Sequence, residues 1–295
     1  MELQWPLIIF TVLLAWSCGV FATQGVLALK GEGKEIQMPA LITSVVLLAV
    51  SGIAVFFHLQ HWERIFNGFG HITSGITQEL IVIVVFAVVA VAYFAMLRKS
   101  EDGATVPSWL AVAAIVVSVV LAVVSAHSYM MAARPAWDTF AWPLAMLFGG
   151  GAAGALTVMA MLSAKGGGSA IGGLLATALT AVSAVAAVAL VAVWQFSSGA
   201  FEDVGYHFDP TAPTSPLVDI AAETNVLSGD LAPLVWLGIV AVGALAPVVC
   251  AVLARKKGGK SWLALGSAGA ACAVLGAVCL RVAFYELGLS VFMLY

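Results

Sequence analysis

The sequence predicts an all-α, polytopic integral membrane protein with eight transmembrane helices. Hydrophobic residues make up 62% of the chain and charged residues only 9%, whereas a soluble domain carries about a quarter charged residues. The apolar residues are gathered into eight runs, each close to the roughly 20 residues that an α-helix needs to cross a bilayer core. No basic patch of the kind that binds nucleic acid is present. Membrane lipid is therefore the expected surrounding of most of the chain.

The eight predicted spans follow one another along a single domain, residues 1–295. Their expected limits are about 5–28, 38–59, 73–97, 107–131, 138–163, 170–196, 231–254 and 261–285. Their length and their Ala, Val and Leu content favour helices over the short strands of a membrane barrel. The first span lacks a preceding basic segment, so we interpret it as a retained helix rather than a cleaved signal peptide. We expect two four-helix bundles, although no internal repeat marks that division.

Small residues and cysteines inside the spans are expected to serve packing. The fifth span holds four glycines that would let a neighbouring helix approach closely: Gly149, Gly150, Gly151 and Gly154. The cysteines also lie inside spans and form no Cys-x-x-Cys pair; they are Cys18, Cys250, Cys272 and Cys279. We expect these thiols to pack as small apolar groups, and we expect no metal site and no iron–sulfur cluster in this chain.

The loops differ strongly in their positive charge. The connections after the first, third, fifth and seventh spans hold nine of the twelve Lys and Arg: Lys30, Lys34, Arg98, Lys99, Lys165, Arg255, Lys256, Lys257 and Lys260. Basic loops stay in the cytoplasm, so both termini are predicted to face outward. The long outer connection, about 197–230, is acidic; a loop that faces a protein partner and a merely solvated loop are equally compatible with it.

Ionisable residues near the outer ends of the spans are the candidates for chemistry. His58 ends the second predicted span, Arg64 follows in the connection, and Glu79 lies about two turns into the third span. An imidazole titrates near neutral pH and can take a proton from a hydroxyl, with a carboxylate assisting. A carboxyl group at membrane depth is costly and needs a partner, which favours a functional role for Glu79.

Two further groups lie at the same side of the membrane. His127 stands with Tyr129 and Arg134 at the end of the fourth span, and Arg281 precedes Glu286 at the end of the eighth. An ion pair between Arg281 and Glu286 is one expectation. The three groups converge only if their helices are neighbours, which the sequence does not decide.

Three other functions are compatible with these residues. His58 and His127, on different helices at similar depth, could ligate a haem b. A secondary transporter would also carry ionisable residues in its helices, but usually at the membrane midplane, whereas here they gather at one boundary. A purely structural role is a third alternative.

An ordered set of short patterns resembles one known family. The pattern Gln4-Trp5-Pro6-Leu7 through Thr11 opens the chain, and His58-Leu59 through Arg64-x-Phe66-Asn67 to Gln78-Glu79 follows. Pro135-Ala136-Trp137-Asp138-Thr139 and Arg281-x-x-Phe284-Tyr285 complete the set. In this order they resemble the membrane anchor subunit of dimethyl sulfoxide reductase, the DmsC family of molybdopterin oxidoreductase complexes. This chain departs from the family at Gln60-His61-Trp62, where the turn is bulkier.

The resemblance implies a cofactor-free membrane anchor in a bacterial cytoplasmic membrane. Such a subunit would oxidise menaquinol in anaerobic respiration and pass electrons to an iron–sulfur subunit, which serves a molybdopterin catalytic subunit. His58 matches the family histidine at the quinol site, and Arg64, Phe66 and Glu79 match residues of the same region. His127 and Arg281 are added as further candidates for the menaquinol pocket. The terminal electron acceptor stays open.

Overall fold

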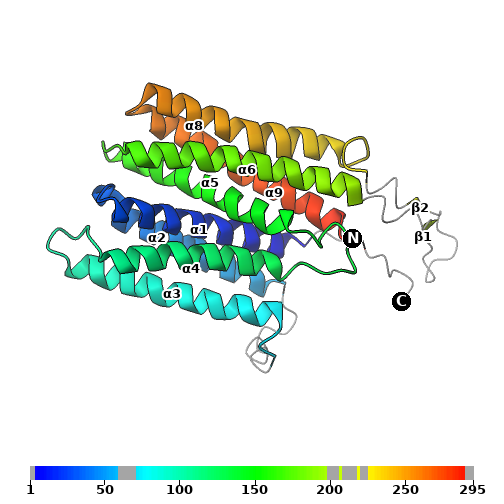
Figure 1. Cartoon of the computed structure of the whole chain (residues 1–295), viewed down its shortest axis with the longest axis horizontal. Coiled ribbons are helices and arrows are strands. Elements are labelled where there is room, and N and C mark those ends of the chain that lie inside the picture. Colours follow the sequence, from blue (N-terminus) through cyan, green and yellow to red (C-terminus); the bar gives the residue numbers. More distant parts are fainter. Residues whose placement is uncertain (1–3, 59–70, 198–205, 208–217, 220–224, 290–295) are drawn as a thin grey trace.

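The computed structural model describes residues 4–58, 71–197, 206–207, 218–219 and 225–289. Within them, eight helical spans are long and apolar enough to cross a membrane, as the sequence predicts. Figure 1 shows these helices side by side in one array, with their axes roughly aligned. The predicted outer loop, 197–230, lies mostly outside the described residues. Its described part includes a short antiparallel pair, β1 (Tyr206–His207) and β2 (Val218–Asp219).

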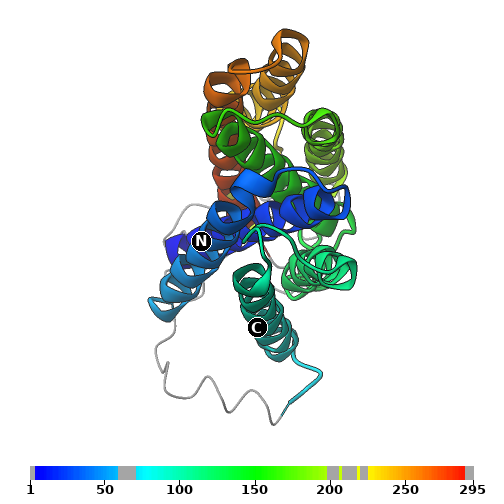
Figure 2. The same ribbon diagram turned by 90° about the vertical axis from the view of Figure 1, so that its left-hand side faces the viewer.

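The first four spans form one group of helices. They are α1 (Trp5–Leu29), α2 (Gln37–Phe56) with its leading turn η1 (Lys34–Ile36), α3 (Gly75–Lys99) and α4 (Ser108–His127). α1 packs against α2 and α4, and α3 packs mainly against α4. In the end view of Figure 2, α3 lies at the outer side of this group.

The last four spans form the second group. They are α5 (Ala141–Ala164), α6 (Ala170–Ser197), η4 with α8 (Leu234–Leu245 and Ala246–Lys257), and η5 with α9 (Trp262–Gly266 and Ser267–Glu286). α5 packs against α6 and α9, and η4 packs against α9. α1 also packs extensively on α5, so a large interface joins the first four spans to the last four. The expected division into two bundles stays a prediction.

The junction of α1 and α5 depends on glycine. A Cβ atom at Gly19 would overlap the carbonyl oxygen of Gly150, and one at Gly154 would overlap the backbone of Gly19. These backbones therefore touch directly, as in small-residue helix pairs of membranes. The predicted close approach at Gly150 and Gly154 is present, whereas Gly149 has ordinary space around it, with Ser183 Oγ 3.9 Å from an added Cβ.

Several helix ends differ from the predicted limits. α2 ends at Phe56 and α4 at His127, so His58 and Tyr129 follow their helices instead of lying within them. α8 continues past the predicted limit to Lys257, because a helix can extend its polar end beyond the apolar core, and Gly258, with φ 66°, ends it.

The segment before α8 departs from regular α-helix geometry. It is the π-helix η4, which runs directly into α8. Pro247, near the start of α8, lacks the N–H that a regular helix would bond to the preceding turn. This missing donor accompanies the change of helix type, which hydropathy alone does not predict.

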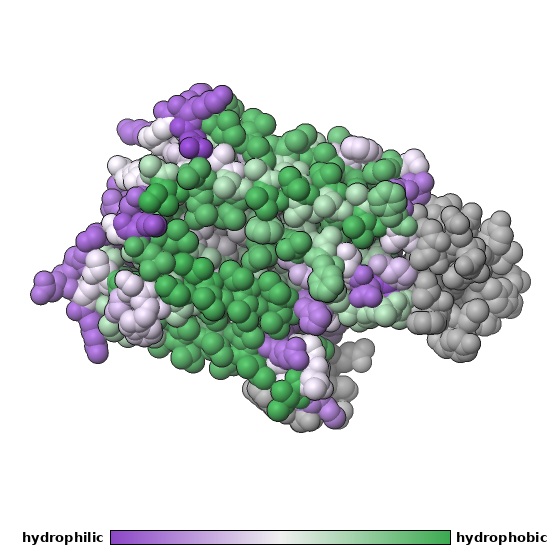
Figure 3. Space-filling model, in the orientation of Figure 1, coloured by the Kyte–Doolittle hydropathy of each residue, from purple (hydrophilic) through white to green (hydrophobic). Residues whose placement is uncertain are grey.

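The two ends of the array differ in charge. The nine Lys and Arg residues named above lie in the last turns of α3 and α8 or in the connections that follow α1, α5 and α8, and these segments share one end, called here the basic end (Figure 1). Figure 3 shows hydrophilic residues there beside a broad apolar belt. At the basic end Lys34 Nζ lies 2.9 Å from a carboxylate oxygen of Asp102, and this hydrogen bond holds the pKa of Asp102 well below its usual range. α1 begins and α9 ends at the opposite end.

Candidate functional site

Glu79 is a buried carboxyl group at the end of the array opposite the basic end. It lies one turn into α3 and is 7% exposed. Ser125 of α4 donates a hydrogen bond from its Oγ to Glu79 Oε1. The residues that the structure describes offer Glu79 no cationic partner within ion-pair distance. A carboxyl group at membrane depth that is hydrogen-bonded to a hydroxyl is well suited to exchange a proton.

Five aromatic side chains form a cluster near Glu79, called here the aromatic cluster. Its members are Tyr129, Trp137, Trp142, Phe284 and Tyr285. The ring of Phe284 stacks on Trp137, with centroids 4.6 Å apart, and on Trp142, 3.9 Å apart. Tyr129 meets Trp137, Phe284 and Tyr285 edge-on. The cluster joins the residues after α4, the start of α5 and the end of α9 into one packed unit.

Hydrogen bonds from indole and guanidinium groups hold the corner that precedes α5. Trp137 Nε1 donates to the carbonyl oxygen of Phe284 at 2.5 Å, and Trp194 Nε1 of α6 donates to that of Ala136 at 3.0 Å. Arg134 donates to the carbonyl oxygen of Gly288, and its guanidinium carbon lies 4.5 Å from the ring centroid of Trp137. The corner between α4 and α5 is thus fixed to α6 and to the end of α9.

Arg281 is a buried cation in α9, only 3% exposed. Its Nε donates to Thr11 Oγ1 of α1 at 2.9 Å, and its Nη1 donates to the carbonyl oxygen of Ala277 at 3.1 Å. Its guanidinium carbon lies 5.5 Å from the ring centroid of Trp142. The expected ion pair with Glu286 is wrong: Arg281 points across to α1, and among the described residues it has no carboxylate partner.

Two buried polar atoms of the aromatic cluster lack a hydrogen bond within the described part of the chain. They are Tyr285 Oη and Trp142 Nε1. Such atoms are rare in folded proteins, and each calls for an explanation, such as a bound ligand or water. Tyr285 Oη lies beside the phenol of Tyr129, and each phenol affects the pKa of the other. Burial raises the pKa of Tyr129 well above its usual range.

The structure brings some of the predicted site residues to the aromatic cluster and leaves others exposed. Glu79 and Arg281 both lie close enough to the aromatic cluster to interact with Tyr129. His58 and His127 are exposed side chains, the first in the turn after α2 and the second at the end of α4. Arg64 and Phe66 lie outside the described residues. The described contacts thus join α3, α4 and α9 at the site, and they include none between His58 and Glu79.

Some residues of this arrangement were not recognised from the sequence as site residues. Ser125 lies in a run of Val and Ala, and a serine there has no pattern that sets it apart. Thr11 belongs to the opening pattern of the chain, but that pattern does not predict a contact with Arg281. Trp142 follows closely after the Pro135-Ala136-Trp137 corner in the sequence. That position does not predict its contact with Phe284.

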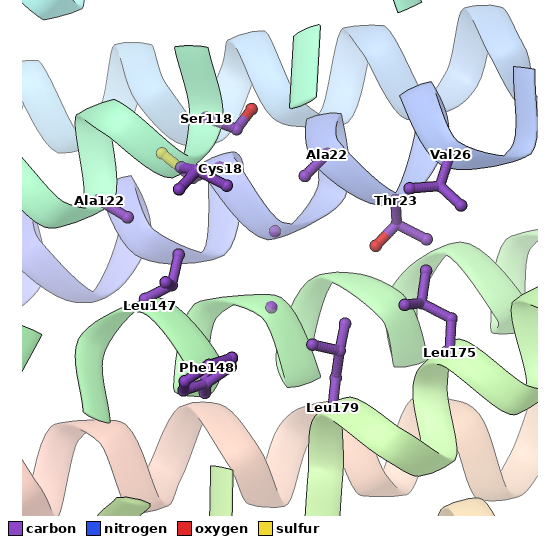
Figure 4. A pocket seen from close by; sticks show the side chains of 13 residues that line it. Cys18, Ala22, Thr23, Val26, Ser118, Ala122, Leu147, Phe148, Leu175 and Leu179 are labelled. Atoms are coloured by element: carbon purple, nitrogen blue, oxygen red, sulfur yellow. The ribbon is translucent and has the colours of Figure 1, made fainter. Parts of the chain in front are cut away.

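A further cavity lies away from this cluster, between α1, α4, α5 and α6. It measures about 180 Å³. Figure 4 shows that its walls are mostly aliphatic side chains, such as Leu147 and Leu179, with Thr23 and Ser118 as polar exceptions. Its lining includes no charged residue and so offers no acid–base group.

Sequence comparison adds a family match to these features. The sequence model of the family described as DMSO reductase anchor subunit (DmsC) matches residues 1–201. That range includes α1 to α6, and with them Glu79, Ser125 and the corner before α5. No curated protein matches the chain.

Proposed function

The chain belongs to the DMSO reductase anchor subunit (DmsC) family, and from that premise we propose that it binds and oxidises menaquinol and passes the electrons to a partner. It is a multi-pass membrane protein and the membrane anchor of an oxidoreductase complex. The finer proposal names an iron–sulfur subunit as the electron acceptor and a molybdopterin subunit as the catalytic partner. The proposed setting is the bacterial cytoplasmic membrane during anaerobic respiration.

The observation that carries the proposal is the environment of Glu79. This buried carboxyl group accepts a hydrogen bond from Ser125 and lies at the same end as the buried guanidinium of Arg281. In the aromatic cluster, Trp142 Nε1 makes no hydrogen bond to the described residues, and Tyr285 Oη lies beside the phenol of Tyr129 and near Glu79. A quinol offers two hydroxyl groups that donate or accept hydrogen bonds and later lose their protons. The buried polar atoms and the carboxylate are complementary to such a headgroup.

An apolar groove between α2 and α3 supports entry of the substrate from the bilayer. It measures about 320 Å³ and is lined by aliphatic and aromatic side chains of both helices, including Leu41, Phe86 and Ala90. Glu79 lies seven residues before Phe86 and eleven before Ala90, which places all three on one face of α3. The groove suits an isoprenoid tail whose headgroup reaches toward Glu79.

The proposed reaction converts one quinol to a quinone with release of two protons and two electrons. His58 accepts one proton and Glu79 the other, and both pass to the water at this end of the membrane. In this proposal Arg64 orients the headgroup, and Phe66, His127 and Arg281 are the further residues of the pocket. The electrons leave to an iron–sulfur cluster of the partner subunit.

The test is quinol-dependent reduction of the partner's clusters in the assembled complex, followed by rapid mixing. We expect Glu79→Gln and His58→Ala to slow this reduction by about 100-fold, since general acid–base groups contribute factors of that order. Glu79→Gln keeps the shape of the side chain and an oxygen that can accept the bond from Ser125, so the fold is expected to survive.

The matched control is Ser125→Ala, which removes the hydroxyl but leaves the carboxyl group in place. It should lower the rate far less than Glu79→Gln does. If both Glu79→Gln and His58→Ala reduce the clusters at the wild-type rate in an intact complex, the proposed site is wrong.

A further inference from the structure

We propose that a cavity at the basic end binds the phosphate of an anionic phospholipid headgroup. The cavity measures about 390 Å³ and lies between two turns, the one that joins α5 to α6 and the one that joins α8 to η5. Arg255 forms part of its wall, with Ser163 and Ser169, while Met159 and Trp262 supply apolar surface. This site is remote from Glu79 and independent of the quinol proposal.

The two turns are fixed relative to each other, so the cavity has a defined shape. Ser163 Oγ of α5 donates to the carbonyl oxygen of Gly259 at 3.1 Å, which ties one turn to the other. Ser169 Oγ accepts from the backbone N–H of Gly172 at 2.7 Å, at the start of α6. Trp262 is buried, and a Cβ at Gly173 would lie 3.2 Å from its ring.

The two segments that enclose the cavity carry only positive charge, and Arg255 is the cation that lines it. Residues 164–170 and 255–262 hold no Asp or Glu, but they hold five cations: Lys165, Arg255, Lys256, Lys257 and Lys260. One carboxylate approaches, since Glu35 Oε1 would be 3.0 Å from a Cβ at Gly167. None of the five cations forms an ion pair with a residue that the structure describes. A bound anion would balance this excess.

The surroundings favour a lipid over a free anion. The cavity lies where the helices leave the apolar belt, and Trp262 is of the residue type that marks that boundary. Basic pockets between transmembrane helices at the cytoplasmic side are typical sites for anionic headgroups. Arg255 would contact the phosphate, and the apolar surface at Met159 and Trp262 would contact the first carbons of the lipid.

Native mass spectrometry of the purified, delipidated complex tests the proposal. Phosphatidylglycerol and phosphatidylcholine are titrated separately. We expect phosphatidylglycerol to bind about ten-fold more tightly, and Arg255→Gln to remove most of that preference. Arg98→Gln is the matched control, because Arg98 is an exposed cation at the same end but outside the cavity; it should change binding less than about two-fold.

A second variant tests whether lipid binding needs the space inside the cavity as well as the charge of Arg255. Gly168→Leu places a side chain at the cavity wall where a Cβ meets no atom within 4 Å, so the fold should accept it while lipid binding falls. The proposal is overturned if Arg255→Gln and Gly168→Leu both bind phosphatidylglycerol like the wild type. It is also overturned if inorganic phosphate displaces the lipid completely, because the site would then take a free anion.

Discussion

Arg281 shows how one residue can remain charged inside the membrane region. A buried charge is costly unless it is hydrogen-bonded or paired. Here the guanidinium donates to Thr11 and to the carbonyl oxygen of Ala277, and it lies over the ring of Trp142. Three neutral partners thus take the place of a carboxylate. The contact with Thr11 also fastens the end of α9 to the start of α1.

The contact between Thr11 and Arg281 makes a prediction about stability. Thr11→Val removes the hydroxyl acceptor and leaves a buried charged donor with one partner fewer, so we expect a loss of about 1.5–3 kcal/mol in unfolding free energy. Unfolding of the purified chain in detergent, followed by circular dichroism, measures it. Arg281→Met combined with Thr11→Val should lose less than the sum of the single variants; strict additivity would mean that the two residues do not interact.

The sequence predicted which residues bring an ionisable group to membrane depth, but it did not predict their hydrogen-bond partners. Glu79 and Arg281 stand out because a charge inside an apolar run is rare. Ser125 and Thr11 do not stand out, because a hydroxyl residue in a membrane helix is common and bonds to its own backbone at little cost. The roles of all the predicted site residues, Glu79 and Arg281 included with His58, Arg64, Phe66 and His127, stay predictions.

At the scale of elements, the contact between α1 and α5 holds the two groups of helices together. Without a hydrophobic driving force between helices in lipid, tight packing stabilises such pairs, and it requires small residues. Gly19 and Gly154 let the two backbones meet. Since α1 belongs to the first group of helices and α5 to the second, this contact joins the halves of the molecule.

Replacing Gly154 with a larger residue should disrupt the contact between α1 and α5. In Gly154→Leu the new Cβ would overlap the backbone of Gly19, which cannot yield as a flexible side chain does. We expect a loss of at least about 3 kcal/mol, or failure to accumulate in the membrane. Gly149→Ala is the control on the same helix, because its Cβ meets only Ser183 Oγ at 3.9 Å. Equal yield and thermal stability of both variants would show that the contact is not needed.

The order and length of the elements could be predicted, but their details could not. Hydrophobic runs define eight helices because a bilayer demands a fixed length. The π-helical form of η4, the end of α4 at His127 and the stacking of Phe284 between Trp137 and Trp142 depend on neighbours that hydropathy does not describe. An aromatic residue near a helix end has the same hydropathy whether it faces lipid or another ring.

For the whole molecule, the uneven distribution of charge is the leading feature. Nine of twelve Lys and Arg lie in helix ends and connections of the basic end, while Glu79, Arg281 and the aromatic cluster lie at the other. If the basic end is cytoplasmic, the proposed quinol site is near the outer surface, and protons from quinol oxidation leave there. The partner subunits would dock on the same side.

This orientation can be tested with single cysteines in a background that lacks the four native ones. In Lys257→Cys the thiol should resist a membrane-impermeant maleimide in intact cells, whereas in His127→Cys it should react, because both positions are exposed but lie at opposite ends. Labelling after lysis provides the control for accessibility. Reaction at position 257 and protection at position 127 would reverse the proposed topology.

Photolabelling shows whether the end of the array around Glu79 binds menaquinol. The assembled complex is irradiated with an azido-menaquinone and its peptides are analysed by mass spectrometry. We predict labels on peptides of α3 and α9 near Glu79 and Tyr285, suppressed by excess menaquinone and weakened in Glu79→Gln. Labels confined to the basic end or to the α5–α6 surface, with equal competition, would contradict the claim.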